Sequence, residues 1–498
     1  MIFYLRYFFI ILFFIQILIP AALAQQEDSS EGSMSLEGET GAYDVSKAVR
    51  EGKEIILKQK QQLTEKEKSK EEKAEKLEEV EKAARQKVYE QQIVEEATIP
   101  RSTVALERQL SREKFRREIM VAAGRETEIP FKLRKKFNLN TTETYDDNIF
   151  LTKIDKKEDY ITKISPSALF SLSSKFVVLD ANYVMDFTRY KNSDEQNGTN
   201  HLLLAYIRPG TLALPFFHRK GGKIGFEIQD EFQPLVTSVA TSEQTSRTDR
   251  TYNKFFFMAD YYMSAKRTLT LEYVNVYQNY RGAALQSYSY TENTISPIFY
   301  FHIRPKWSLL AGYDYSMMDY STGSNSSTHQ RLKTGLTGTI FTKVLAHLEV
   351  GKEWRKYADD KNGQAQGLFF KSALVNKFSP SATASLQYTH SMMESTYGGN
   401  PYYMSDALSF DSEYKFTSKT AGVFRLDLFH NGYDKDTIED GVIRKRQDNI
   451  WKPELGLKYY FKRWIYANLK YAYAKRTSNF AKFDYVDNIV TTGVNIRF

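Results

Sequence analysis

The chain has 498 residues, of which 26% are charged, and a formal net charge of +8 at neutral pH. It contains no cysteine, which excludes a thiolate metal site and a thiol nucleophile. Tyrosine and phenylalanine are abundant (34 and 33 residues) while tryptophan is scarce (4 residues), a composition that suits surfaces meeting both water and hydrocarbon.

The N-terminus has the pattern of a secretory signal peptide over residues 1–24. Residues 7–19 are nearly all apolar, and the small-x-small sequence ALA at residues 22–24 predicts a cleavage site before Gln25. The alternative is an uncleaved membrane anchor, but the apolar run is shorter than the ~20 residues that a spanning helix needs. No later segment has a continuous apolar run of that length, so no further membrane-spanning helix is predicted.

Two regions without a globular core follow the signal peptide. Residues 25–44 are rich in Gly, Ser, Glu and Gln and predict a disordered leader. Residues 45–130 predict a charged helical region, because residues 53–99 lack Gly and Pro and place opposite charges four positions apart. Its sparse apolar residues favour a weak coiled coil. Acids and bases alternate evenly, so no nucleic-acid partner is expected.

Beyond residue 130 the apolar period changes from helical to two. The sequence VVLDANYVMDF at residues 177–187 alternates apolar and polar side chains, and residues 455–461 and 465–473 do the same. Alternation over about ten residues is typical of strands with lipid on one side and water on the other. Strands of soluble sandwiches are usually nearer five or six residues. We therefore predict an all-β transmembrane barrel over residues 131–498.

An aromatic residue followed by a polar loop recurs at intervals of 36–47 residues, with Leu235 in the third place. Each interval accommodates one strand, a tight turn and the returning strand, which predicts 18 antiparallel strands, with 16 as the alternative count. We expect these aromatic residues and the C-terminal one to form a girdle at the membrane interface. The girdle candidates are Tyr145, Tyr190, Tyr280, Tyr320, Tyr357, Tyr397, Tyr433, Phe480 and Phe498.

The connections predict which side of the membrane each rim faces. Short turns at residues 265–267 and 462–464 indicate the periplasmic side, and longer polar loops at residues 191–200 and 238–251 indicate the extracellular side. Prolines interrupt four returning strands and each costs a ladder hydrogen bond in a closed sheet, so we predict β-bulges there. These prolines are Pro166, Pro209, Pro297 and Pro453.

Charged residues that alternate with the apolar ones predict a charged lumen. Rings of such groups select permeant ions by charge, although a cross-paired interior without selectivity is equally compatible with the pattern. A register shift of one residue would exchange every assignment. The predicted lumen-facing residues are Asp180, Asp186, Glu227, Glu231, Glu272, Glu349, Glu353, Arg355, Arg425, Asp427, Lys458, Lys470, Arg476 and Arg497.

No catalytic residue, metal site or cofactor is predicted. Asp146, Asp147 and Asn148 carry oxygen ligands that suit Ca²⁺, but the glycine and glutamate positions of an EF-hand are missing, so a polar loop is the main interpretation. His390 and Ser391 are adjacent on a strand and point to opposite faces. His430 with Asp434 is the remaining hydrolase candidate.

The sequences ETYDDNIFLT and KKEDYITKISPSALFSL resemble the opening hairpin of the putative beta-barrel porin 2 family. The resemblance covers residues 138–498 and implies an outer-membrane barrel associated with exopolysaccharide production and export, without defined catalytic residues. The charged helix departs from the usual short leader. The alternating last strand ends at an aromatic residue, which resembles the signal for the barrel assembly machinery. The matching positions are Tyr145, Asp146, Asp147, Asn148, Ile149, Phe150, Asp159 and Pro166.

The sequence thus predicts a Gram-negative-type outer-membrane channel that passes polar solute, or secreted exopolysaccharide, passively. Three alternatives stay open: a general diffusion porin, a scaffold barrel plugged by its own N-terminal segment, and an outer-membrane hydrolase. The expected partners are outer-membrane lipid, the barrel assembly machinery, a polysaccharide and a periplasmic partner of the charged helix. The sequence leaves the solute, the oligomeric state and that partner open.

Overall fold

The computed structural model describes residues 132–173, 177–209, 224–238, 248–264, 266–280, 289–304, 306–321, 326–340, 344–359, 363–395, 400–439 and 441–498. The predicted signal peptide, leader and charged helical region, residues 1–130, lie outside these ranges. In the ranges that are described, no helix is long and apolar enough to cross a membrane.

The described chain forms one sheet of 18 strands, which confirms the predicted count and excludes the alternative of 16. Among the described residues, two short 3₁₀ helices, η1 (Asp194–Gln196) and η4 (Ala481–Phe483), lie in loops between strands. The strands are β1 (Lys132–Asp146), β2 (Asp159–Ser173), β3 (Val177–Tyr190), β4 (Gly198–Pro209), β5 (Ile224–Ser238), β6 (Thr248–Ser264), β7 (Arg267–Tyr280), β8 (Tyr290–Arg304), β9 (Trp307–Tyr320), β10 (Ser327–Ile340), β11 (Val344–Tyr357), β12 (Gln364–Ser379), β13 (Ala382–Glu394), β14 (Tyr402–Lys415), β15 (Thr420–Glu439), β16 (Val442–Lys462), β17 (Ile465–Ser478) and β18 (Tyr485–Arg497).

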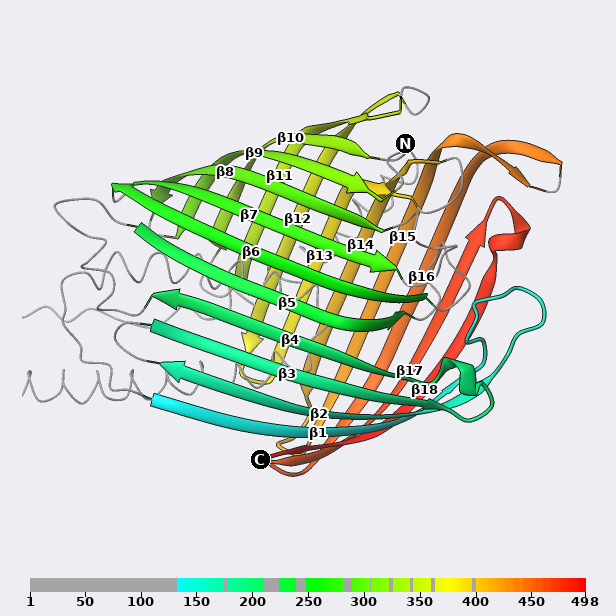
Figure 1. Cartoon of the computed structure of the whole chain (residues 1–498). Helices are drawn as coiled ribbons and strands as arrows, with labels where there is room; N and C mark the ends of the chain where they lie inside the picture. The colour runs from blue at the N-terminus through cyan, green and yellow to red at the C-terminus, as the bar shows by residue number, and fades with distance from the viewer. Residues whose placement is uncertain are drawn as a thin grey trace, which may run out of the picture. The chain divides into compact units, whose positions relative to one another are not determined.

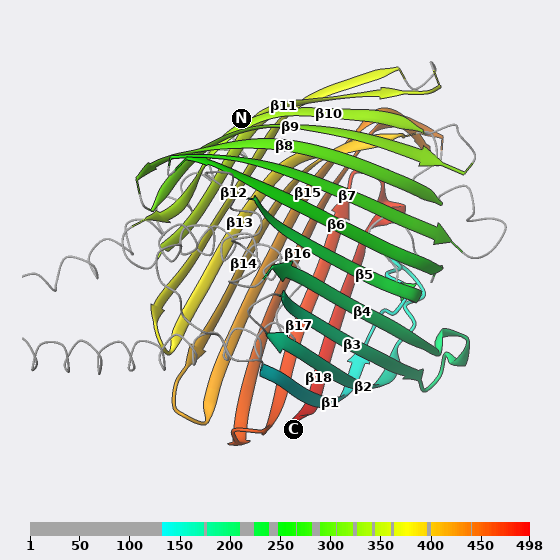
Figure 2. The ribbon, with the colours of Figure 1, turned by 60° about the vertical axis from the view of Figure 1, so that its left-hand side comes forward.

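The sheet closes on itself. Each strand pairs antiparallel with its successor, and β1 pairs with β18 from Asn138 opposite Arg497 to Asp146 opposite Ile489. Figure 1 shows β1 (cyan) beside β18 (red), and Figure 2 shows the same closure from a second direction. A closed sheet has no free edge, so no strand presents a whole row of unpaired backbone groups at a sheet edge.

Alternation gives the barrel an apolar outer face and a polar inner face. In β9, Leu309 is 44% exposed while its neighbour Leu310 is 2% exposed. Leu348 and Val350 of β11 are exposed in the same way, and Glu349 between them is buried. Exposed leucine and valine side chains in continuous rows suit a hydrocarbon environment.

The two rims of the barrel differ in the length of their connections. We call the rim where even-numbered strands end the turn rim, and the opposite one the loop rim. At the turn rim β6 ends at Ser264 and β7 begins at Arg267, whereas at the loop rim residues 147–158 separate β1 from β2. Two connections break this rule: β4 ends at Pro209 before β5 begins at Ile224 on the turn rim, and residues 440–441 alone join β15 to β16 on the loop rim.

The predicted bulges at the prolines are wrong. The β16–β17 pairing runs from Trp451 opposite Lys475 to Glu454 opposite Ala472, so it omits Lys452 and Pro453 without a change of register. The pairings at Pro166 and Pro297 are interrupted in the same way, and Pro209 ends β4. A proline lacks only its own N–H, and at these three prolines the ladder omits two residues of each strand and resumes in the same register. The observed register shifts lie elsewhere, for example between Gly432 and Asp436.

Candidate functional site: the inner face of the barrel

The pairing register places all of the predicted lumen-facing residues on one face of the sheet, the face without the exposed apolar rows, which we call the inner face. Residues directly opposite one another in an antiparallel pair point to the same side of the sheet. The register therefore connects these charged residues from strand to strand, as with Glu353 opposite Arg331 and Lys470 opposite Thr491. The exposed apolar rows lie at the intervening positions. Whether these residues contact a solute stays a prediction. They are Asp180, Asp186, Glu227, Glu231, Glu272, Glu349, Glu353, Arg355, Arg425, Asp427, Lys458, Lys470, Arg476 and Arg497.

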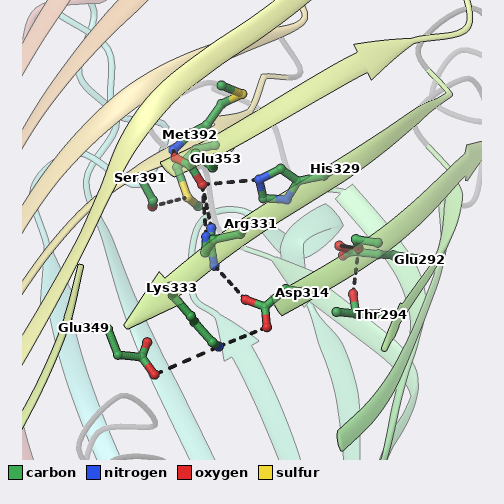
Figure 3. A network of polar contacts seen from close by, with 12 residues as sticks. Glu292, Thr294, Asp314, His329, Arg331, Lys333, Glu349, Glu353, Ser391 and Met392 are labelled. Atoms are coloured by element: carbon green, nitrogen blue, oxygen red, sulfur yellow. Dashed lines mark hydrogen bonds and ion pairs between the residues drawn. The ribbon is translucent and has the colours of Figure 1, made fainter. Parts of the chain in front are cut away.

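A fully buried carboxylate, Glu353, organises the inner face of β10 and β11 (Figure 3). Its Oε2 accepts hydrogen bonds from the Arg331 guanidinium at 2.7 and 3.2 Å and lies 3.2 Å from His329 Nε2. Its Oε1 accepts the backbone N–H of Met392 at 2.6 Å. A buried carboxylate is tolerated only when it is paired and hydrogen-bonded in this way.

A row of alternating charges continues from Arg331 toward the turn rim. Arg331 Nη1 lies 3.7 Å from Asp314 Oδ2, and the Lys333 ammonium lies 3.0 Å from Asp314 Oδ1 and 3.9 Å from Glu349 Oε1. Gly351 faces Lys333 across the strand pair, and a Cβ there would collide with the Leu332 carbonyl oxygen. Glycine thus permits the close approach of β10 and β11 that brings these charges together.

Side chains replace the backbone ladder between β12 and β13 near the loop rim. Within the described residues, β12 stays paired with β11 as far as Gln364, while its pairing with β13 ends at Phe370 opposite His390. The bond from the Met392 N–H to Glu353 lies just beyond that point. Farther along, Glu394 forms an ion pair with Arg355 and accepts a hydrogen bond from the Tyr320 hydroxyl at 3.3 Å. We call this stretch the β12–β13 seam.

The structure differs from the expected aromatic girdle. Tyr280, Tyr320, Tyr357 and Tyr433 are 2–8% exposed and share the inner face with the charged residues, and Tyr190 also lies on that face. The repeat correctly marks strand ends at the loop rim. However, these tyrosines stand an odd number of positions from the apolar residues of their strands that point outward, as Tyr280 does from Tyr277. Alternation therefore directs them inward.

The other girdle candidates are placed differently. Tyr145 lies on the outer face with its ring centroid 5.2 Å from that of Tyr160. Phe498 is exposed, Phe480 is buried just before η4, and Tyr397 lies outside the described residues. Exposed aromatics on the outer face include Tyr277 and Trp451, which the repeat did not find.

Sequence reasoning also missed a stacked cluster of charges and rings on β15–β18. Arg446 and Asp448 are fully buried and form two hydrogen bonds, at 3.1 and 2.5 Å. The Arg446 guanidinium lies 4.6 Å from the ring centroid of Tyr433 and 3.6 Å from that of Phe483 in η4. Arg446 and Asp448 stand an even number of residues before Glu454 and Lys458 on β16, so their side chains point to the same face. Extending the alternation of β16 toward the loop rim would have predicted them as inner-face residues.

The segment that follows β1 is a loop whose polar side chains bond to other parts of the protein. Asn148 is fully buried, and its amide nitrogen donates hydrogen bonds to the carbonyl oxygens of Thr152 at 2.7 Å and Val486 at 3.0 Å. Asp147 Oδ1 accepts the backbone N–H of Asn488 at 2.7 Å, and Oδ2 accepts its side-chain amide at 2.6 Å. No group of three or more His, Asp or Glu side chains in the described residues could hold a metal ion.

The ionisation of Asp147 reflects these bonds. Partial burial alone would raise the pKa of its carboxyl group. The hydrogen bonds from Asn488 and the charge of Lys156 outweigh burial, so the pKa is lowered from its ordinary value of 3.8. Asp147 is therefore a carboxylate at neutral pH, bonded to β18.

A cavity of about 270 Å³ lies against the inner face between this loop and β15–β18. Its walls carry both charges and apolar side chains. The lining residues are Asp146, Ile149, Leu151, Arg425, Asp427, Lys452, Pro453, Glu454, Ala472, Tyr473, Ala474, Tyr485, Asp487 and Ile489.

The hydrolase candidates are directed to other partners. His430 Nδ1 lies 2.9 Å from the side-chain oxygen of Asn449, and Asp434 lies 3.6 Å from the Lys445 ammonium. His390 lies 2.7 Å from Asp406. By the pairing register, His390 and His430 lie on the outer face of the barrel, opposite to the charged inner face.

The chain is similar to a family of porins over its C-terminal part. The family described as Putative beta-barrel porin 2 matches residues 311–498, which confirms the resemblance there. No curated protein matches the chain. A closed barrel with an apolar exterior is the architecture of outer-membrane proteins, so the chain is a porin-like outer-membrane β-barrel.

Several solved structures are similar to this chain at low identity. Pseudomonas aeruginosa OpdK with vanillate matches at 9% identity and a TM-score of 0.42, over 73% of this chain and 99% of that one. Pseudomonas aeruginosa OccK2 (OpdF) in complex with glucuronate matches at 8% identity and 0.42, over 74% and 98%. Acinetobacter baumannii OccAB4 matches at 10% identity and 0.41, over 75% and 99%.

Proposed function

We propose that this protein passes polar solutes passively across the outer membrane through the interior of its barrel. The observation that supports this is the single charged inner face of a closed sheet, continuous over all of the strands that carry predicted lumen residues. Such a face offers a solute hydrogen-bond donors and acceptors in place of its water shell.

The chemistry of that face favours weakly charged or neutral solutes. Most of its charges stand in compensating pairs, such as Lys163 with Asp186 at 2.9 Å and Lys470 with Glu454 at 3.0 Å. A compensated wall presents no strong field of one sign to a permeating ion. We therefore expect small ion selectivity, rather than the strong preference that an uncompensated ring of one charge produces.

The solute that we propose is a polysaccharide, or its fragments, destined for the cell exterior. Support comes from the resemblance to porins associated with exopolysaccharide export and from the compensated hydrogen-bonding wall. The charged helical region that the sequence predicts before the barrel is our candidate to contact a periplasmic partner, and β18 is the strand that we propose for recognition by the barrel assembly machinery. The part of the chain before β1 lies outside the described residues, so these partners rest on the sequence.

Single-channel recording of the mature protein in planar bilayers tests the proposal. We expect discrete conductance with low ion selectivity, and partial current block by soluble polysaccharide fragments. A matched protein lacking residues 25–130 shows whether that region limits the current. Absence of conductance in both forms would contradict passage through the barrel.

The same recordings separate the rival functions. A general diffusion porin conducts without interaction with any polysaccharide. A plugged scaffold conducts only after residues 25–130 are removed. A hydrolase would show a measurable activity that His430→Ala abolishes, and the contacts of His430 lead us to expect no such activity.

A further inference from the structure

The cavity under the loop of residues 147–158 lies where the hydrogen-bond ladder between two strands is interrupted. The β16–β17 ladder omits Lys452 and Pro453, and the residues across the gap are Tyr473 and Ala474. All four line the cavity. The proline interrupts the ladder locally and the register continues unchanged on both sides, so the recess is part of the fold rather than a fault in pairing.

The polar groups of this cavity are not all satisfied by the protein. Asp487 Oδ1 and the Tyr485 hydroxyl are buried without a hydrogen-bond partner, and both residues are at most 3% exposed. The Lys452 ammonium has no ion pair or hydrogen bond among the described residues, although it lines the same space. Buried polar groups without partners are costly unless something in the cavity bonds them.

The charges define what can enter. The cavity holds four carboxyl groups, those of Asp146, Asp427, Glu454 and Asp487, against the two cations Arg425 and Lys452. Arg425 is already bonded to Asp427 at 2.9 Å, and Glu454 to Lys470 at 3.0 Å. These ion pairs compensate charge within the cavity, which favours an uncharged guest, and the carboxyl groups offer acceptors to hydroxyl groups while Lys452 and Tyr485 supply donors.

The cover of the cavity is apolar and firmly attached. Ile149 and Leu151 line it from the loop, and Ile489 lines it from β18. Asn148 fastens that loop to β18 through its bond to the Val486 carbonyl oxygen. The cavity therefore combines apolar walls with a few convergent polar groups, the composition of small-molecule sites.

Building on the proposed function, we infer that this cavity is a binding subsite for one uncharged sugar ring. Its volume of about 270 Å³ lies just under the ~300–1,000 Å³ typical of small-molecule pockets, which suits a single ring better than an oligomer. Sugar hydroxyls donate to the carboxyl groups and accept from Lys452, and the C–H face of the ring contacts Ile149 and Leu151. The subsite holds one sugar unit against the wall during passage.

Titration calorimetry of the detergent-solubilised full chain with D-glucose, together with single-channel current fluctuations, tests this inference. Wild-type protein binds glucose, and the variant Lys452→Met weakens binding about tenfold or more, because a buried hydrogen bond from a charged donor is lost. Lys254→Met, an exposed inner-face lysine outside the cavity, is the matched control and leaves binding unchanged. Ala474→Leu, which fills part of the cavity, weakens binding without removing any charge.

The outcomes distinguish this inference from the proposed function. If the channel conducts but binds no glucose, or if Lys452→Met and Lys254→Met behave alike, the subsite is refuted while passage of solute stands. Tighter binding of D-glucuronate than of D-glucose refutes the proposal that the subsite prefers an uncharged sugar. If the protein binds glucose but never conducts, the proposed passage fails and the subsite remains.

Discussion

Two regions of the inner wall handle buried charge in opposite ways. On β9–β11, Asp314, Glu349 and Glu353 each lie within 4 Å of a lysine or arginine. At the cavity against β15–β18, in contrast, Lys452 has no such partner among the described residues and Asp487 keeps a buried oxygen without a hydrogen bond, although Arg446 and Asp448 on the same strands are paired. The ion pairs on β9–β11 link neighbouring strands, whereas the polar groups at the cavity can bond the sugar that we propose as its ligand.

The difference follows from what surrounds each charge. At the β12–β13 seam the ladder stops, so the carboxylate of Glu353 serves as the acceptor for the Met392 N–H that β12 does not bond. At Pro453 the ladder skips two residues and resumes, and the space beside it stays open as the cavity. A ladder defect can thus be closed by a side chain or kept as a recess.

Removing the central carboxylate of the first region is expected to have the largest effect. The variant Glu353→Ala leaves Arg331 and the Met392 N–H without their acceptor, and breaking a buried ion pair typically costs about 3–5 kcal/mol. Urea unfolding of the folded barrel in detergent measures the loss. Lys419→Ala, in an exposed turn at the turn rim, is the control and should change stability by under ~0.5 kcal/mol. Equal stability of the two variants would show that the seam does not depend on Glu353.

The loop over the cavity offers a second, smaller test. The variant Asn148→Ala removes the bonds to Thr152 and Val486 and should destabilise the loop by about 1–3 kcal/mol, without unfolding the barrel. The Thr152 N–H donates to Asn148 Oδ1 at 3.0 Å, so hydrogen exchange at that amide should accelerate by about tenfold or more. Asn192→Ala, in an exposed loop elsewhere, is the control. Unchanged exchange at Thr152 would mean that other contacts hold the loop.

The smallest expected effect is a pH dependence at the same loop. Because folding lowers the pKa of Asp147 below its ordinary value of 3.8, its contribution is complete above that value and is lost as the pH falls through the lowered pKa. Exchange at the Asn488 amide, corrected for its intrinsic pH dependence, should rise in that acid range. Asp147→Asn should remove the step. A step that persists in this variant would assign it to another group.

The architecture could be predicted from the sequence because apolar and polar side chains alternate along the strands. Leu469 and Lys470 could be assigned to opposite faces from their alternation alone, and the register agrees. The tyrosine repeat located strand ends but misassigned their direction, since Tyr280 and the outward Tyr277 differ by an odd number of positions.

The seam and the cavity were beyond sequence reasoning because they depend on where pairing stops. The end of the β12–β13 ladder at Phe370 and the inward position of Asn148 arise from contacts between residues distant in the chain. Pro453 signalled an interruption, but a bulge and a skipped pair have the same sequence signature.

The most direct test of the account is thiol accessibility along a single strand, which is possible without background because the chain has no cysteine. Leu469→Cys and Lys470→Cys are compared in outer membranes with a charged, membrane-impermeant maleimide. The account predicts labelling at position 470, on the wet inner face, and protection at position 469, on the lipid face. Equal labelling, or the reverse order, would contradict a closed barrel with a polar interior.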